Sequence, residues 1–205
     1  MKKIVVRKQV EVAMPFLDDK YLKYTPLSSL SVETIREGFK TLGYIGDLKV
    51  VENKQSGAVL AGMPVDDRFE IIVQVSVRTK PVPFVPTQLK KYKQVGMVNV
   101  SAFSESEGYA KQGHARAVYN LLATKFDLVS DHYQYLGAKR LWKSLSKETD
   151  INIYVFDGNI GDYLRDSKFT IIRYNGKNLD DKKIWHCTDA SYENILLVAS
   201  IRKLI

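Results

Sequence analysis

The sequence predicts an α+β fold: a mixed, mostly antiparallel sheet with helices on both faces. The first observation is the run Phe69–Arg78, in which apolar residues alternate with mostly polar ones, as in a half-buried antiparallel strand. The second is a pair of segments whose apolar residues recur at i, i+3, i+4 and i+7, the spacing of one helix face. These residues are Ala115, Val118, Tyr119 and Leu122, and then Ala138, Leu141, Trp142 and Leu145.

The first part of the chain is expected to contain a strand at Lys3–Val12 and then a helix that starts at Ser31 and ends at Gly43, a natural C-cap. The apolar face of this helix consists of Val32, Ile35, Phe39 and Leu42. Strands of an antiparallel meander are expected next, at Leu48–Glu52, Ala58–Ala61 and Phe69–Arg78.

The segment Pro81–Pro86 contains three prolines, which lack the backbone donor that a central strand needs. It is therefore expected to be a stiff extended loop or lid, and Gln88–Gln94 are assigned to the same excursion. Strands and helices then alternate. The expected strands are Val95–Phe103, Phe126–Val129, Ile151–Phe156, Phe169–Tyr174 and Asn194–Ile201, and Asp131 with Gln134 resembles a capping box before the second helix.

The length of 205 residues and the apolar fraction of 45% fit one domain, 1–205, with a good core. No apolar run approaches a membrane span, and charges interrupt the short apolar stretch in Met1–Lys8, so we expect a soluble cytoplasmic protein without a signal peptide. The single cysteine, Cys187, excludes an internal disulfide and a cysteine cluster for zinc.

The net charge of +8 favours an acidic partner, which would be coenzyme phosphates, nucleic acid or an acidic protein surface. Two clusters contribute to it: Lys2, Lys3, Arg7 and Lys8, and then Lys90, Lys91 and Lys93. Each cluster could equally be an ordinary solvated face. No zinc-finger, RNA-recognition or basic-zipper pattern accompanies them, so any nucleic-acid binding would be weak and independent of sequence.

The segment Tyr109–Ala115 is the strongest candidate for chemistry, because it follows a strand and opens a helix through Gly113. The first amides of a helix point along its axis at the positive end of the dipole and can hold a pyrophosphate. Glycine would let that backbone approach the phosphates closely. An ordinary strand-to-helix turn would show the same pattern.

The order of strand, phosphate-type turn, helix, strand, helix and strand over residues 95–156 resembles the GNAT superfamily of acyl-coenzyme A N-acyltransferases. Tyr109, Gly113 and Ala115 match the family's turn, whereas Ala110 replaces its first Gln or Arg. In the family's next signature Ala138 matches, but Tyr135 replaces an asparagine and Trp142 replaces a tyrosine that often serves as general acid. A second pattern resembles divergent GNAT-like proteins of tailed bacteriophages. It consists of Ser130, Asp131, Gln134 and Gly137, followed by Leu141 and Trp142.

The resemblance implies that acetyl-coenzyme A is the acyl donor and assigns residues to it. Pantetheine contacts are implied for Ser101, Ala102 and Phe103, and pyrophosphate contacts for Lys111, Gln112, Gly113, His114, Ala115 and Arg116. Glu105, or Glu107, would be the base, and Tyr135, or Tyr133, the acid. Each of these could instead be a solvated loop carboxylate or a half-buried tyrosine, and Trp142 is expected in the core.

Two functions are therefore predicted. The first is an acetyl-coenzyme A-dependent N-acetyltransferase with an unknown acceptor amine on a protein or a small molecule. The second is a GNAT-fold protein without catalysis, a phage-encoded binding or structural module for a host protein, a virion component or DNA. Ala110 and Trp142 favour the second, and Tyr109, Gly113 and Ala115 favour the first.

Overall fold

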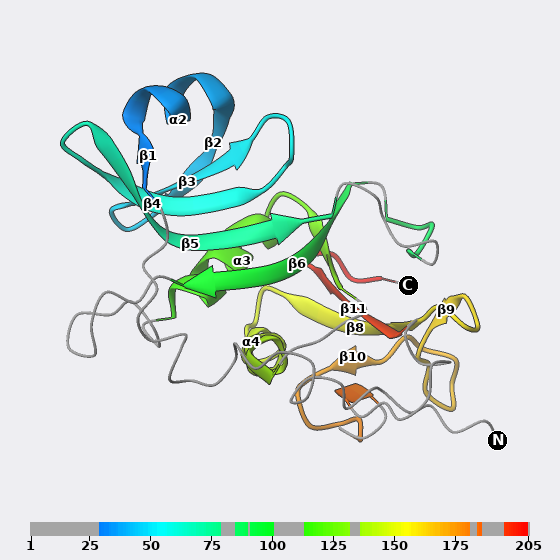
Figure 1. Ribbon diagram of the computed structural model, residues 1–205. Coiled ribbons are helices and arrows are strands. Elements are labelled where there is room, and N and C mark those ends of the chain that lie inside the picture. Colours follow the sequence, from blue (N-terminus) through cyan, green and yellow to red (C-terminus); the bar gives the residue numbers. More distant parts are fainter. Residues whose placement is uncertain are drawn as a thin grey trace. The chain divides into compact units, whose positions relative to one another are not determined.

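Figure 1 shows a computed structural model of the protein, which describes residues 29–78, 85–89, 91–100, 113–131, 136–180, 184–185 and 195–204. The chain forms two compact units. Unit 1 comprises Met1–Met14, Lys80–Gln94 and Leu122–Ile205, and unit 2 comprises Pro15–Thr79 and Val95–Leu121. The fold is α+β with mostly antiparallel strand pairing, as the sequence predicts.

Unit 2 is built on an antiparallel meander whose strands follow one another in the chain (Figure 1). These strands are β2 (Phe39–Ile45), β3 (Leu48–Asn53), β4 (Val59–Val65), β5 (Arg68–Val77) and the larger part of β6 (Tyr92–Val100). The short β1 (Leu30–Ser31) pairs with β5. Two-residue turns, Gly46–Asp47 and Asp66–Asp67, join β2 to β3 and β4 to β5, and Gly46 and Asp66 take the positive φ angles of +54° and +53° that such tight hairpins need.

Helix α2 (Val32–Gly38) starts at Ser31 as predicted, and the Thr34 amide donates to Ser31 Oγ at 3.1 Å. The prediction that this helix continues through Leu42 to a cap at Gly43 is wrong, because Phe39–Ile45 forms strand β2. Aromatic and β-branched residues in that segment favour a strand, and the turn at Gly46 lets it pair with β3. Ile35 and Leu42 are still buried, and the partly buried Phe39 packs against the cluster of Ile35, Val51, Leu60, Phe69 and Ile71.

Gly43 has a packing role instead of a capping one. It lies at a register shift in β2, and a Cβ atom there would come within 3.2 Å of Leu121 Cδ1. Leu121 belongs to helix α3 (His114–Ala123), so the missing side chain lets this helix lie directly against the bulged strand.

Unit 1 contains β7 (Asp127–Ser130), α4 (Leu136–Leu145), β8 (Asn152–Asp157), β9 (Asp162–Tyr163), β10 (Arg173–Tyr174) and β11 (Ile195–Ser200). The hydrogen-bonded order is β10-β8-β11-β7, followed by the first residues of β6, and β9 pairs with β8. All residues of β7, β8 and β11 are buried, which explains why these strands read as nearly continuous apolar runs.

Strand β7 runs parallel to the start of β6. The Asp127 amide donates to the Lys91 carbonyl at 3.0 Å, and Gln94 Nε2 donates to the Ser130 carbonyl at 3.3 Å. The contacts come in the same order along both strands, so the strands point the same way. Parallel neighbours need a crossover connection, and the chain between them contains α3.

The core of unit 1 collects aromatic residues from several strands, among them Tyr154, Phe156 and Tyr163. The Tyr163 ring meets the other two edge to face, at centroid distances of 6.0 and 5.2 Å. Its hydroxyl is buried and has no hydrogen-bond partner among the residues that the structure describes. Burial, with the nearby Asp127 carboxylate, raises the pKa of Tyr163.

Most strands and the second helix lie where the sequence predicts them, but some predictions need correction. The prediction that Gln88–Gln94 form a loop is wrong for Tyr92–Gln94, which are the first residues of β6, and Lys93 and Gln94 are buried there. No proline follows Pro86 in this segment, so the backbone donors that a strand needs are present. The ammonium groups of Lys91 and Lys93 lie 4.9 and 4.8 Å from the centre of the Phe126 ring, so this part of the basic cluster is not simply a solvated face. Phe169–Tyr174 is a strand only at Arg173–Tyr174, since Phe169 lies in a turn with φ +61°.

The predicted strand Lys3–Val12 and the first four residues of the predicted loop Pro81–Pro86 lie outside the described residues, as does Gln134 of the predicted capping box. Within the described ranges, no helix has both the length and the apolar character required to cross a membrane.

Trp142 is a core residue, as the helix spacing predicts: it is 2% exposed, and Leu145 on the same face of α4 is fully buried. We expect Trp142→Ala to lower the free energy of unfolding by about 3 to 5 kcal/mol, because a large buried ring is lost and a cavity remains. The exposed Arg140 on the same helix is the control, and Arg140→Ala should change stability by less than about 0.5 kcal/mol. Urea unfolding measures both; a small loss for the Trp142 variant would contradict the packing assignment.

Gly62 is the glycine with the least room. A Cβ atom there would lie 2.0 Å from the Glu70 carbonyl oxygen of the paired strand, at a register shift between β4 and β5. Gly62→Ala should therefore cost about 1 to 3 kcal/mol or more, because backbone atoms must move. Gly38→Ala is the matched control, since nothing lies within 4 Å of its Cβ position, and it should be neutral or slightly stabilising. Equal thermal midpoints for the two variants would refute the expected crowding.

Candidate functional site

The candidate phosphate turn is described from Gly113 onward. Helix α3 starts at His114. The first hydrogen bond of this helix runs from the Ala117 amide to the Gly113 carbonyl, at 3.0 Å. Gly113 thus occupies the N-cap position, with φ +83°, a left-handed conformation that side-chain-bearing residues rarely adopt. The prediction that a glycine turn opens this helix is confirmed.

Among the residues that the structure describes, which do not include 101–112, a Cβ atom at Gly113 would meet within 4 Å only the Arg116 guanidinium, whose Nη2 atom would be 3.9 Å away. In any helix the amides of the first turn have no acceptor inside the helix and point out along the axis. The backbone of Gly113–Arg116 therefore combines amide dipoles and a cationic side chain at one point, a donor set that suits phosphate oxygens.

The rest of α3 fixes this turn in place. Val118, Tyr119, Leu122 and Ala123 are buried, and Arg116 on the other side is exposed. Burial raises the pKa of Tyr119, so it stays a neutral phenol. Asn120, which nothing in the sequence singles out, has a buried Oδ1 without a hydrogen-bond partner in the described part of the chain.

His114 is half-buried at the helix start. Partial burial lowers its pKa from the ordinary value of 6.5. The imidazole is therefore mainly neutral at pH 7, and the opposition that a protonated histidine would meet from the helix dipole does not arise.

The other predicted site residues lie outside the described residues. They are Ser101, Ala102, Phe103, Glu105, Glu107, Tyr109, Lys111, Gln112, Tyr133 and Tyr135. The structure thus brings Gly113, His114, Ala115 and Arg116 together on one helix turn. Trp142 stands at the position of the GNAT signature where a tyrosine often serves as general acid. Here it is buried in the core of unit 1.

Comparison with known proteins gives no relative. No protein-family model, no curated protein and no solved structure matches this chain. Any function assigned to the protein must therefore be inferred from its own residues.

A separate surface depression of about 490 Å³ lies in unit 2, at the turn between β3 and β4. Its polar groups serve the turn: Asn53 Oδ1 accepts from the Gln55 and Ser56 amides at 3.0 and 2.8 Å, and Lys54 Nζ donates to the Glu37 carbonyl at 2.6 Å. None of the predicted site residues lines it. Among the described residues, no three His, Cys, Asp or Glu side chains gather as metal ligands.

The lowered pKa of His114 predicts an acid-dependent loss of stability. The folded protein disfavours the imidazolium form of His114. The contribution of the neutral imidazole to the free energy of unfolding is therefore complete above pH 6.5, and it is lost as the pH falls through the lower pKa of the folded state. We expect the free energy of unfolding of the unsubstituted protein to fall more steeply on acidification than that of His114→Gln. Chemical unfolding at pH 8 and at successively lower pH gives the difference, and parallel curves for the two proteins would rule the effect out.

Proposed function

We propose that the protein is an acyl-coenzyme A-dependent N-acyltransferase of GNAT type, with acetyl-coenzyme A as donor and an amine of unknown identity as acceptor. The observation that carries the proposal is the start of α3, where Gly113 in a left-handed conformation caps the helix and the Arg116 guanidinium lies beside it. The parallel start of β6 and β7, with a helix in the connecting chain, also supports it.

The residues present fit the pyrophosphate of the coenzyme. The amides of His114 and Ala115 would face its oxygens, and Arg116 would add a charge-assisted hydrogen bond. The φ of +83° accounts for the glycine at position 113, and the absence of a side chain there lets a phosphate approach the first amides of the helix. When bound, acetyl-coenzyme A supplies a thioester acyl group.

Amine acylation requires two proton transfers beside this binding turn. In the proposal Glu105 takes the proton that the attacking amine loses, and Tyr135 gives a proton to the departing sulfur, so that a new C–N bond replaces the C–S bond. Ser101, Ala102 and Phe103 would contact the pantetheine arm, and Lys111 and Gln112 would extend the phosphate contacts.

A second candidate function is a non-catalytic binding module on the same fold. The burial of Trp142 favours it, because the position that carries an acid in the related signature is here a core residue at 2% exposure. Such a module would keep the turn at Gly113 without turning over an acyl donor. Coenzyme binding without acetyl transfer to any amine in a panel would favour this second function.

The phosphate-binding turn predicts that Gly113→Glu abolishes coenzyme binding while the protein remains folded. The carboxylate would occupy and repel the pyrophosphate position at the helix start. Gly113→Gln is the matched control, because it imposes the same backbone strain and nearly the same volume without the charge, and it should retain more affinity than the Glu variant. Isothermal titration with coenzyme A measures both.

A thermal shift provides the positive test on the unsubstituted protein. Acetyl-coenzyme A at a hundred times its dissociation constant should add about 2.7 kcal/mol to the free energy of unfolding. Absence of any shift, or an unchanged affinity in a folded Gly113→Glu variant, would remove the assignment of this turn to coenzyme phosphates.

A further inference from the structure

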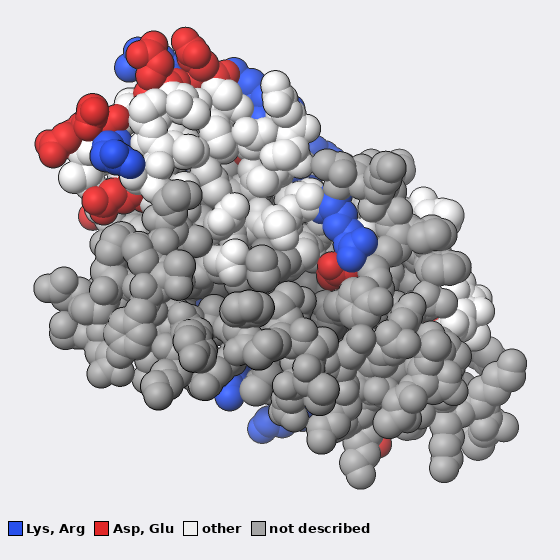
Figure 2. Space-filling model, viewed as in Figure 1, with Lys and Arg blue, Asp and Glu red and all other residues white. Residues whose placement is uncertain are grey.

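The net positive charge of this protein belongs to unit 1. Unit 1 contains 21 Lys and Arg residues against 12 Asp and Glu, a net charge of +9, whereas unit 2 contains 10 against 11, a net charge of −1. In unit 2 the acidic side chains are prominent above α2 and the β4–β5 hairpin (Figure 2), where Glu33, Glu37, Asp66 and Asp67 are exposed. The partner that the net charge favours is therefore a partner of unit 1.

Exposed cations occur at several places in the described part of unit 1. They include Lys125, Arg140, Lys147, Lys168, Lys177 and Lys203. They are spread over separate elements and do not form a pocket for one small anion, so the attraction that unit 1 offers an acidic partner is that of its net charge.

In the part of unit 1 that the structure describes, the Phe169 ring lies outside the core. Phe169 is 80% exposed, and its backbone has φ +61°. That conformation is unfavourable for a residue with a bulky side chain, and here no burial compensates for it. Glycine or asparagine would suit the turn better. The exposed ring therefore calls for an explanation outside the folding of the unit.

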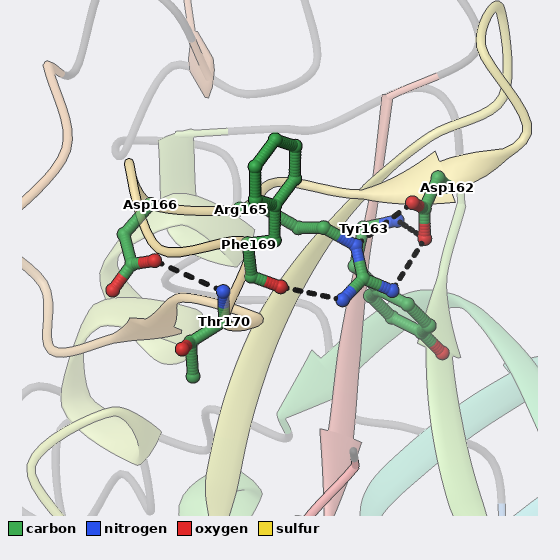
Figure 3. A network of polar contacts seen from close by, with 6 residues as sticks. All are labelled: Asp162, Tyr163, Arg165, Asp166, Phe169 and Thr170. Atoms are coloured by element: carbon green, nitrogen blue, oxygen red, sulfur yellow. Dashed lines mark hydrogen bonds and ion pairs between the residues drawn. The ribbon is translucent and has the colours of Figure 1, made fainter.

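A network of polar contacts holds this turn rigid (Figure 3). Arg165 Nε donates to Asp162 Oδ2 at 2.9 Å, and Arg165 Nη1 donates to the Phe169 carbonyl at 2.8 Å. Asp166 Oδ1 accepts from the amides of Lys168 and Thr170, at 2.8 and 2.9 Å. Figure 3 shows the Phe169 ring pointing away from these polar groups.

The network also settles the local charge. The Asp162 carboxylate is engaged by Arg165, whose hydrogen bond lowers the pKa of that carboxyl and keeps it ionised. The Asp166 carboxylate faces the backbone of its own turn. Lys168, the residue before Phe169 in the sequence, is also exposed, in a unit of net charge +9.

We propose that the Asp162–Thr170 turn is a stacking platform for single-stranded nucleic acid, in which a base stacks on Phe169 and Lys168 contacts the adjacent phosphate. Proteins that hold single strands without sequence preference combine a positive surface with exposed aromatic rings, because every base has a face that can stack. Because hydrogen bonds fix the backbone of this turn, binding has to order only the two side-chain torsions of Phe169. This activity is separate from acyl transfer and does not depend on coenzyme binding at Gly113.

The experiment is a fluorescence anisotropy titration of the full chain with a labelled oligothymidine of about 20 nucleotides, longer than the site of one such module. We expect binding at low salt that weakens linearly in log-log with salt concentration. Phe169→Asn should weaken binding by about 5-fold to 150-fold, the equivalent of one lost stacked base. Its thermal midpoint should equal or exceed that of the unsubstituted protein, because asparagine tolerates the left-handed backbone.

Three further variants keep the test decisive. Phe169→Leu retains the backbone strain but removes the ring and should lose affinity like the Asn variant, whereas Phe169→Tyr retains the ring and should bind normally. Tyr44→Asn is the matched control, because Tyr44 is 65% exposed but lies in unit 2. It should leave the affinity unchanged. Absence of binding at low salt, or equal affinity in the Phe169 and Tyr44 variants, would overturn the proposal, and tighter binding of duplex than of single strands would do the same.

Discussion

Unit 1 depends on the insertion of β11 between β7 and β8. Six consecutive residue pairs join β11 to β8, from Ile195 opposite Asp157 to Ser200 opposite Asn152, and Val198 and Ala199 face Val129 and Leu128 on the other side. The Leu197 amide also donates to the buried Ser130 Oγ at 2.9 Å. With both faces of these strands buried, no hydrogen-bonding group can be left to water, so the register of β11 fixes the positions of its neighbours.

Periodicity predicted the elements whose burial matches a simple pattern. The alternation in β5 and the helical spacing in α3 and α4 correspond to real core faces, with Val75, Val118 and Trp142 all buried. The prediction was wrong where the same residues fit both a helical and a strand pattern. The apolar residues from Val32 to Leu42 have the spacing of one helix face, but Phe39 and Leu42 lie in β2, which pairs with β3 across the hairpin turn at Gly46. Tertiary pairing outweighed local spacing there.

The candidate site was predictable only in part, and for a physical reason. A glycine before a helix is visible in the sequence, and the structure adds its left-handed φ and the position of Arg116, which spacing cannot give. Phe169 was assigned to a strand because its apolar neighbours suggest one. The contacts that turn the chain there come from Asp162, Arg165 and Asp166, whose side chains bond to backbone groups and leave no periodic signal.

The two units also differ in how far apart along the chain their contacts are. The hairpins of unit 2 join residues a few positions apart, as in the turns at Gly46 and Asp66, whereas the hydrogen bond from Leu197 to Ser130 closes 67 residues. Loop closure of that length must precede any gain from pairing, so the meander of unit 2 is expected to form early and β7 and β8 to wait for β11. Until β11 is in place, the edges of β7 and β8 that will pair with it are exposed. Unit 1 is then the part of the chain most prone to aggregation.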